Sequence, residues 1–415
     1  MKTLRTLKVM NDPIYGFITI PNTFIFNLIE HPYFQRLRRI NQMGVSYLVY
    51  PGAQHTRFHH AIGAMHLMQQ AIYVLKLKGV KITKKEQNGL LAAILLHDIG
   101  HGPFSHALEG LLLPSVSHEQ ISLVYMELLN KEFKGKLDTC IQIFKGEHPK
   151  KFLYELISSQ LDMDRLDYLK RDSFYTGVAE GNVNSERLIK MLNVVNGELV
   201  VEQKGIYSIE QFLLSRRMMY WQVYLHKTNI VAENILVKIM QRASYLVKIG
   251  ANIPCSRALK EILQLKNATS NTLGDPSEFL SQKRMEQFSD LDDFDIISAI
   301  KEWKNHSDFI LRELSRRFIY RDLFKIKMSK TPITNELKKQ KARKIQKKLG
   351  VSKQDLHYFL IEDQISNQVY NKKTQKIKLL NKNDTWSYFS HQSDPFQGQF
   401  LSKKVIKYFL CYPKI

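Results

Sequence analysis

The strongest constraint on the fold is a stretch in which a charged pair directly follows an apolar run. The run "LLAAILL" at 90–96 leads into His97 and Asp98, and "IGHGPFSH" then adds His101 and His106. A carboxylate at the end of a buried helix is costly unless it is paired, and it opposes the helix dipole. A cation bound beside the pair would resolve both problems.

The pattern of apolar residues predicts a mainly α chain with a helical core. Thr83 and Glu86 form a capping-box signature before the apolar run, and the Gly-Pro punctuation near 100–103 ends the helix. A hairpin is expected around Gln203-Lys204-Gly205, within "GELVVEQKGIYS". Apolar residues at three-and-four spacing predict further helices at about 24–43, 59–78, 208–249, 292–304 and 307–321.

Length and composition predict three units. The chain has 415 residues, of which 44% are hydrophobic, enough for a large core. We expect a helical core with an N-terminal extension over 1–250, a helical lobe over 251–330, and a smaller, basic, mixed α/β region of uncertain fold over 331–415. The three cysteines are widely spaced, which argues against a disulfide framework.

Net charge and hydropathy limit the classes of partner that the protein can have. The net charge of +22 favours polyanions such as nucleotides, nucleic acids or anionic lipid, although a solvated basic face explains it equally well. No apolar run approaches the roughly 18 residues of a membrane-spanning helix. We therefore expect a soluble, cytoplasmic protein that does not act at a membrane.

Other clusters supply the ligands that a metal at His97 and Asp98 would still need. His59 and His60 precede a predicted helix, and "QLDMDRLDYLKRD" offers several aspartates. Nitrogen and carboxylate ligands together suit Fe, Mn, Mg, Zn or Ni, and the sequence does not rank these ions. The competing interpretation makes His97 a hydrogen-bonded core histidine and Asp98 a helix-end carboxylate.

Spare histidines and basic residues surround these clusters. His101, His106 and His118 exceed what one metal needs, and histidine exchanges protons near neutral pH. Arginines and tyrosines flank each cluster, an arrangement that suits hydrolysis of a phosphate ester carrying a base or sugar. P-loop, Rossmann and HExxH motifs are absent from the sequence. A phosphohydrolase is therefore favoured over a metalloprotease.

With these motifs in order, the chain resembles the HD-domain phosphohydrolases. More narrowly, it is similar to the deoxynucleoside triphosphate (dNTP) triphosphohydrolases, such as the animal enzyme with a SAM and an HD domain, but without a SAM-like segment. The resemblance rests on "NDPIYGFI", "HPYFQRLRRINQMG", "YPGAQHTRFHHAIG", "LLHDIGHGPFSH", "SHEQIS", "LDMDRLDYLKRD" and "YLHKTNIVAENI". It implies cleavage of a dNTP into a deoxynucleoside and inorganic triphosphate.

The resemblance also implies roles for particular residues. The implied metal ligands are His60, His97, Asp98 and Asp164, and the catalytic histidines are His118, His106 and His101, with His118 as the general acid. The residues implied to bind substrate are Gln42, Arg57, Arg165, Tyr168, Asp172, Arg216, Tyr224 and Lys227. Tyr224 would lie under the sugar and disfavour a 2′-hydroxyl.

Regulation and assembly are further implications of the resemblance. Some family members bind an activating guanine nucleotide between subunits, at positions that correspond to Lys8, Val9, Glu30, Gln35 and Arg38. Glu30 is one methylene longer than the family's aspartate, and Arg165 replaces the usual lysine, which changes its geometry. A homo-oligomer, dimer or tetramer, is expected on the same ground.

Two alternatives remain open at this stage. The same fold could serve a nucleotidase or phosphodiesterase that acts on monophosphates, cyclic dinucleotides or alarmones. Alternatively, the basic C-terminal runs could make the chain a nucleic-acid-binding protein with a vestigial HD site, whose binding would weaken steeply with salt.

Overall fold

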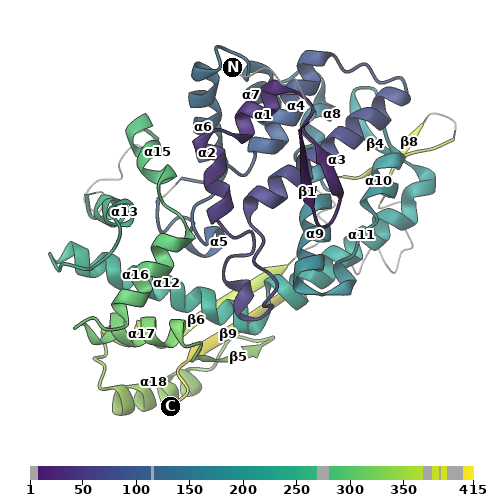
Figure 1. Cartoon of the computed structure of the whole chain (residues 1–415). Coiled ribbons are helices and arrows are strands. Elements are labelled where there is room, and N and C mark those ends of the chain that lie inside the picture. Colours follow the sequence, from purple (N-terminus) through teal and green to yellow (C-terminus); the bar gives the residue numbers. More distant parts are fainter. Residues whose placement is uncertain (1–7, 114–115, 269–279, 368–375, 383–384, 390–404) are drawn as a thin grey trace.

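The computed structural model describes residues 8–113, 116–268, 280–367, 376–382, 385–389 and 405–415. The predicted mainly α class is confirmed, with small sheets added to a helical core (Figure 1). The division into units at 250 and 330 stays a prediction. Among the described residues, none of the helices has both the length and the apolar character needed to cross a bilayer.

Helices α3 (Arg57–Leu77), α4 (Lys84–Leu96) and α9 (Met163–Thr176) form the centre of the core. Every residue of α4 from 89 to 96 is buried, so hydrophobic burial fixes this helix in the middle of the protein. At its start, Thr83 and Glu86 form the predicted capping box, with the Thr83 amide donating to Glu86 Oε2 at 2.8 Å. At its end, His97 is the C-cap, so the charged pair lies inside the core.

The helix predicted over 24–43 is wrong as a continuous element. The chain instead forms α1 (Thr23–Ile29), α2 (Pro32–Gln35) and the 3₁₀ turn η1 (Arg36–Arg39). Pro32 forces His31 out of the helical conformation, and His31 becomes the N-cap of α2. The hairpin of β1 (Val9–Asp12) and β2 (Gly16–Thr19) precedes these pieces.

The hairpin predicted around 203–205 lies earlier in the chain. Strands β3 (Leu192–Val195) and β4 (Glu198–Glu202) pair antiparallel, and Asn196 and Gly197 turn between them with positive φ. Residues 203–205 form the 3₁₀ turn η4 (Gln203–Gly205), which leads into α11 (Ile206–Met219). The π-helical turn η5 (Tyr220–Tyr224) then separates α11 from α12 (Lys227–Lys248).

The C-terminal part packs against the core through sheets and helices. Strand β9 (Val405–Tyr412) is central in a three-stranded antiparallel sheet between β5 (Lys325–Ser329) and β6 (Ile361–Asn367). Strand β7 (Lys378–Leu380) joins β4 in parallel and β8 (Trp386–Tyr388) antiparallel. The basic run becomes the surface helix α18 (Asn335–Leu349).

The remaining elements connect these layers, with η2 (Gly44–Leu48) and α5 (Ser105–Leu108) lying near the site described below. The others are α6 (His118–Glu132), α7 (Asp138–Phe144), α8 (Lys151–Glu155), η3 (Ala179–Gly181), α10 (Ser185–Met191), α13 (Arg257–Ala268), α15 (Gln282–Ser289), α16 (Asp293–Trp303), α17 (Phe309–Ile319) and η6 (Asp355–Tyr358).

Candidate metal centre and active site

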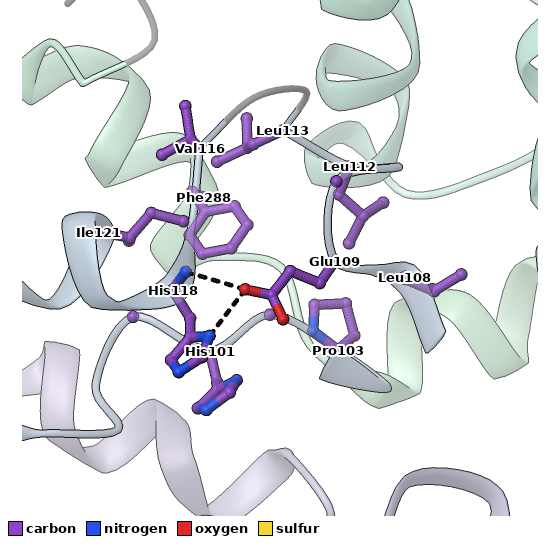
Figure 2. Close-up of a pocket in the computed structure, with 13 residues that line it drawn as sticks. His101, Pro103, Leu108, Glu109, Leu112, Leu113, Val116, His118, Ile121 and Phe288 are labelled. Atoms are coloured by element: carbon purple, nitrogen blue, oxygen red, sulfur yellow. Dashed lines mark hydrogen bonds and ion pairs between the residues drawn. The ribbon is translucent and has the colours of Figure 1, made fainter. Parts of the chain in front are cut away.

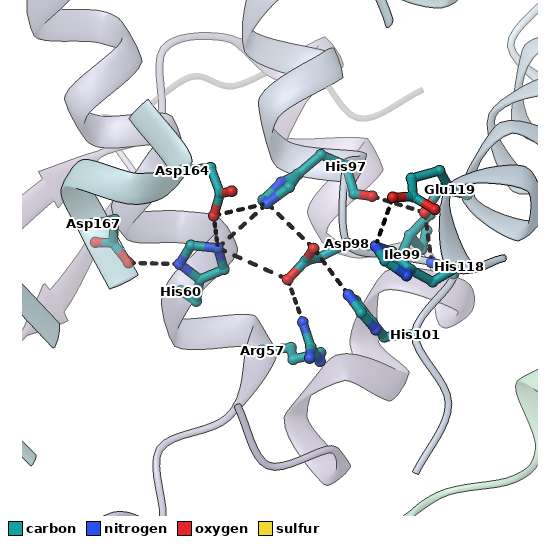
Figure 3. A network of polar contacts seen from close by, with 12 residues as sticks. Arg57, His60, His97, Asp98, Ile99, His101, His118, Glu119, Asp164 and Asp167 are labelled. Atoms are coloured by element: carbon teal, nitrogen blue, oxygen red, sulfur yellow. Dashed lines mark hydrogen bonds and ion pairs between the residues drawn. The ribbon is translucent and has the colours of Figure 1, made fainter. Parts of the chain in front are cut away.

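Three core helices bring the four predicted metal ligands together (Figure 3). His60 Nε2 of α3 lies 3.3 Å from His97 Nε2 and 3.1 Å from Asp164 Oδ1 of α9. Asp98 Oδ1 lies 3.3 Å from His97 Nε2, and its Oδ2 lies 3.8 Å from His60 Nε2. One ligand atom from each of His60, His97 and Asp164 lies within 4.8 Å of the others.

The proton positions on the two histidines fit a bound cation. His97 Nδ1 lies 2.6 Å from the Ile94 carbonyl, which can only accept, and His60 Nδ1 lies 2.8 Å from Asp167 Oδ2. Each Nδ1 is therefore the donor, so Nε2, which faces the centre, is the ring atom left on each histidine to bind a metal ion. Burial opposes protonation, yet hydrogen bonds to Asp164 and Asp167 raise the pKa of His60 to about 10. The negative surplus behind this shift suits a divalent ion.

A second layer holds the ligands in place. Asp167 also accepts from Arg171 Nε at 2.9 Å, and Arg171 Nη1 donates to Asp12 Oδ2 of the N-terminal hairpin at 2.8 Å. Gly63 permits this packing, because a Cβ there would lie 2.1 Å from both Asp167 Oδ1 and Arg171 Nη2. These three charged side chains therefore connect the β1–β2 hairpin to the metal centre.

Asp98 is held in its charged form. Burial raises the pKa of a carboxyl group, but His97, Arg57 and His101 together hold the pKa of Asp98 well below its usual range. Arg57 Nη1 lies 2.5 Å from Asp98 Oδ2, and His101 Nε2 lies 3.3 Å from Asp98 Oδ1. Asp98 is thus both a candidate ligand and the anchor of an arginine.

A histidine pair stands beside the metal centre. His101 stacks on His118, with ring centroids 3.9 Å apart, and burial together with Arg57 lowers the pKa of His101 well below its usual value. His118 Nδ1 lies 2.7 Å from Glu109 Oε1, which also accepts from the His118 amide (Figure 2). On the other side, His118 Nε2 lies 3.3 Å from Glu119 Oε1. Gly100 lets α6 approach, since a Cβ there would meet the His118 carbonyl at 2.2 Å.

These groups open into a cavity of about 440 Å³. The small pocket drawn in Figure 2 has room for only about 20 Å³, so of these two spaces the larger cavity is the one with room for a nucleotide. Its lining includes five of the eight residues implied to bind substrate: Gln42, Arg57, Tyr168, Asp172 and Tyr224. Asp98, His101, His118 and Asp164 line it as well.

Asp172 and Tyr224 form a fixed pair in this cavity. Tyr224 Oη donates to Asp172 Oδ2 at 2.7 Å, and burial with the nearby Asp172 raises the pKa of Tyr224 well above its usual value. His55 Nε2 lies 2.7 Å from Asp172 Oδ1 and holds the carboxylate from the other side. Gln42 Oε1 is buried, with no hydrogen-bond partner in the described part of the chain.

The other predicted substrate residues do not line this cavity. Arg165 forms an ion pair with Asp162, and Arg216 Nη1 donates to Gln160 Oε1 at 2.8 Å. Lys227, at the start of α12, is exposed. His106 lies in α5, and its side chain is outside the described residues.

The residues predicted for an activating nucleotide gather on the surface around α1, α2 and η1. Arg38 Nε donates to Gln35 Oε1 at 2.8 Å, and Gln35 Nε2 donates to the Ile29 carbonyl at 2.7 Å. Glu30 is the exposed C-cap of α1, and Lys8 Nζ lies 5.7 Å from the Phe26 ring centroid. Val9 of β1 is exposed. Their role as an activator site stays a prediction.

Comparison with known proteins now identifies the class. The HD domain model matches residues 57–172, and the model of the HD associated region matches residues 183–252. The chain belongs to the HD-domain phosphohydrolase family, whose members are metal-dependent hydrolases. A solved phosphohydrolase of Bacteroides thetaiotaomicron is 47% identical, with a TM-score of 0.92 over 99% of this chain and 100% of that one.

Characterised and uncharacterised relatives both match. The uncharacterized protein YwfO of Bacillus subtilis is 31% identical over 98% of this chain and 92% of its own length. The human deoxynucleoside triphosphate triphosphohydrolase SAMHD1 is 28% identical over 64% of this chain. The Dictyostelium discoideum homologue is 30% identical over 59%. The match spans about half the length of each of these two triphosphohydrolases.

Proposed function

We propose that the protein hydrolyses dNTPs to a deoxynucleoside and inorganic triphosphate. The observation that carries the proposal is the set of residues that line one cavity. The candidate metal ligands Asp98 and Asp164, the stacked pair of His101 and His118, and the Tyr224–Asp172 pair all line it. Metal-assisted phosphoryl chemistry and sugar recognition therefore have their groups within one space.

The reaction transfers the α-phosphorus from O5′ to a water oxygen. A divalent ion held by His60, His97, Asp98 and Asp164 would supply Lewis-acid polarisation of a phosphate oxygen. His118 Nδ1 donates to Glu109, and His118 Nε2, which lies 3.3 Å from Glu119 Oε1 in the free protein, would turn from that carboxylate to give its proton to the departing O5′. Arg57, fixed by Asp98, offers further N–H donors to phosphate oxygens.

Sugar selection follows from the fixed pair. Asp172 is bound on both sides, by His55 and Tyr224, so its carboxylate stays in position to accept from a 3′-hydroxyl. The Gln42 amide lines the same cavity and offers a donor to that hydroxyl. The Tyr224 ring beneath the sugar would exclude a 2′-hydroxyl and so favour deoxynucleotides.

A second candidate is an HD-domain nucleotidase or phosphodiesterase. The observation in its favour is that Arg165, Arg216 and Lys227 lie outside the described lining, so Arg57 is the one implied phosphate-binding cation within it. Fewer cations suit a substrate with fewer phosphates.

Product analysis tests both candidates. The purified protein is incubated with Mn²⁺ or Mg²⁺ and each dNTP, and the products are separated by ion-exchange chromatography. We expect inorganic triphosphate and a deoxynucleoside, and loss of both products together with bound metal in Asp98→Asn. Release of orthophosphate or pyrophosphate would contradict the proposal and favour the second candidate.

A further inference from the structure

A half-buried carboxyl group in the cavity has no part in the chemistry described above. Glu233 lies two turns into α12 and lines the cavity together with Asn229, four residues before it on the same helical face. The Asn229 amide donates to Glu233 Oε1 at 3.2 Å. Within the described residues, Glu233 Oε2 has no hydrogen-bond partner and neither oxygen is paired with a cation.

The Glu233 carboxyl group is partly shielded from water in the free protein. Burial raises the pKa of Glu233 to about 7, with only the Asn229 hydrogen bond opposing the shift. A carboxyl group that is half shielded from water and has a single neutral partner keeps acceptor capacity for the donors of a ligand. Strongly perturbed acids that line a cleft are candidates for functional residues.

The Asn229 amide group also makes hydrogen bonds to two other residues beside the cavity. Its Nδ2 also lies 3.3 Å from the Tyr224 carbonyl, and its Oδ1 accepts from Ser46 Oγ at 3.2 Å. Glu233 is therefore placed next to the tyrosine proposed to lie under the sugar. It is held there by a side chain that has little freedom to turn.

The residues around the cavity come from two groups of elements. The metal ligands come from α3, α4 and α9, whereas Glu233 stands where α12 packs against η2 and α5. The lining also includes Gly44 and Val45 of η2 and Ala107 of α5, the two elements against which α12 packs. With phosphates at the metal end and the sugar at Tyr224, the base would extend toward Glu233.

We propose that Glu233 selects a guanine base by accepting hydrogen bonds from its N1–H and N2–H groups. The inference rests on the proposed dNTP hydrolysis and names its preferred substrate, dGTP. A carboxylate offers two acceptor oxygens side by side, and guanine alone among the four bases presents two adjacent donors on its pairing edge. Oε1 keeps a free lone pair after accepting from Asn229.

The other bases fit this carboxylate less well. Adenine and cytosine present a donor beside an acceptor, and thymine presents one donor between two acceptors, so each leaves an acceptor facing a carboxylate oxygen. A good bidentate pair discriminates by roughly 5- to 150-fold. Glutamine at the same position would offer one donor and one acceptor, which matches adenine and cytosine.

The test compares specificity rather than total activity. The value of kcat/KM is measured for dGTP, dATP, dCTP and dTTP at about pH 8.5, where a group with a pKa of about 7 is ionised. A fixed concentration of GTP in every assay keeps any activation at the N-terminal residues equal. Glu233→Gln is compared with Glu302→Gln, the same change at an exposed position of α16.

We expect the wild-type protein and Glu302→Gln to prefer dGTP by roughly 5- to 150-fold. Glu233→Gln should lose that preference and gain relative activity on dATP and dCTP. Equal kcat/KM values for the four wild-type substrates, or an equal loss for all four in Glu233→Gln, would overturn the inference.

Binding separates this inference from the proposed reaction. Calorimetric titration with deoxyguanosine and deoxyadenosine measures base preference without turnover. Preferential binding of deoxyguanosine that Glu233→Gln abolishes would support the inference even if no triphosphate is released, and that result would overturn the reaction alone. Equal affinity for the two nucleosides would overturn the inference while triphosphate release still supported the reaction.

Discussion

Replacing Asp167 with Asn should weaken metal binding without removing a metal ligand. The Asp167 carboxylate accepts from His60 Nδ1 at 2.8 Å and from Arg171 Nε and Nη2 at 2.9 and 3.0 Å. Burial opposes ionisation, yet Arg171 and His60 lower the pKa of Asp167 to about 2 from 3.8. That difference corresponds to about 2 kcal/mol in favour of the charged form.

An amide at this position keeps the shape but loses the charge, and its NH₂ group would face the donors of Arg171. His60 would then be held less firmly and would be a weaker ligand. Partners of this kind change metal affinity by roughly 10- to 100-fold, or about 1.4–2.7 kcal/mol. We expect Asp167→Asn to bind Mn²⁺ more weakly by that factor.

Calorimetric titration of Mn²⁺ into metal-stripped protein measures the affinity, and thermal unfolding reports stability. Asp12→Asn is the matched control, because Asp12 pairs with Arg171 at 2.8 Å and no contact with His60 is found among the described residues. It should lower Tm and leave Mn²⁺ affinity unchanged. Wild-type affinity in Asp167→Asn, or an equal loss of affinity in Asp12→Asn, would refute this reasoning.

Two further predictions concern the α4 cap and the histidine pair. Burial raises the pKa of Glu86, but Lys150 and Thr83 outweigh burial and lower that pKa. The ionised Glu86 therefore stabilises the fold at pH values above the pKa of an unfolded glutamate, and this stabilisation is lost as the pH falls through the pKa of Glu86 in the folded protein. Glu86→Gln should therefore lower stability by about 1 kcal/mol at pH 7, with a smaller gap in acid, and a pH-independent Tm difference would count against this. His118→Ala should lose roughly 10²- to 10⁴-fold in turnover with metal content intact, whereas Glu109→Gln should lose less and shift the pH–rate profile. Unchanged turnover in His118→Ala would exclude the general-acid role.

The sequence predicts the helical core well because burial and capping act locally. The apolar run, Thr83 and Glu86 are enough to place α4 and its end. The failures are also local. Pro32 divides the predicted helix over 24–43, and Asn196-Gly197 is a stronger turn signal than the one chosen around 203–205.

The candidate site was predicted only in part from the sequence. Residue types in motif order, with the family resemblance, lead to His60, His97, Asp98 and Asp164, which the structure brings together. The sequence does not predict the supporting roles of His55, Glu109, Asp167 and Glu233. Their roles depend on packing between distant segments, such as Asp167 on His60 across 107 positions. Asp167 and Glu109 had a sequence signal: Asp167 is one of the aspartates in "LDMDRLDYLKRD", and Glu109 is a carboxylate just after "HGPFSH".

The fate of the water oxygen tests the central claim most directly. The protein, Mn²⁺ and dGTP are incubated in ¹⁸O-labelled water, and the products are examined by mass spectrometry and ³¹P NMR. Attack at the α-phosphorus with loss of O5′ predicts one ¹⁸O atom in inorganic triphosphate and unlabelled deoxyguanosine. Label in orthophosphate or pyrophosphate, or in the 5′-hydroxyl of deoxyguanosine, would contradict the account.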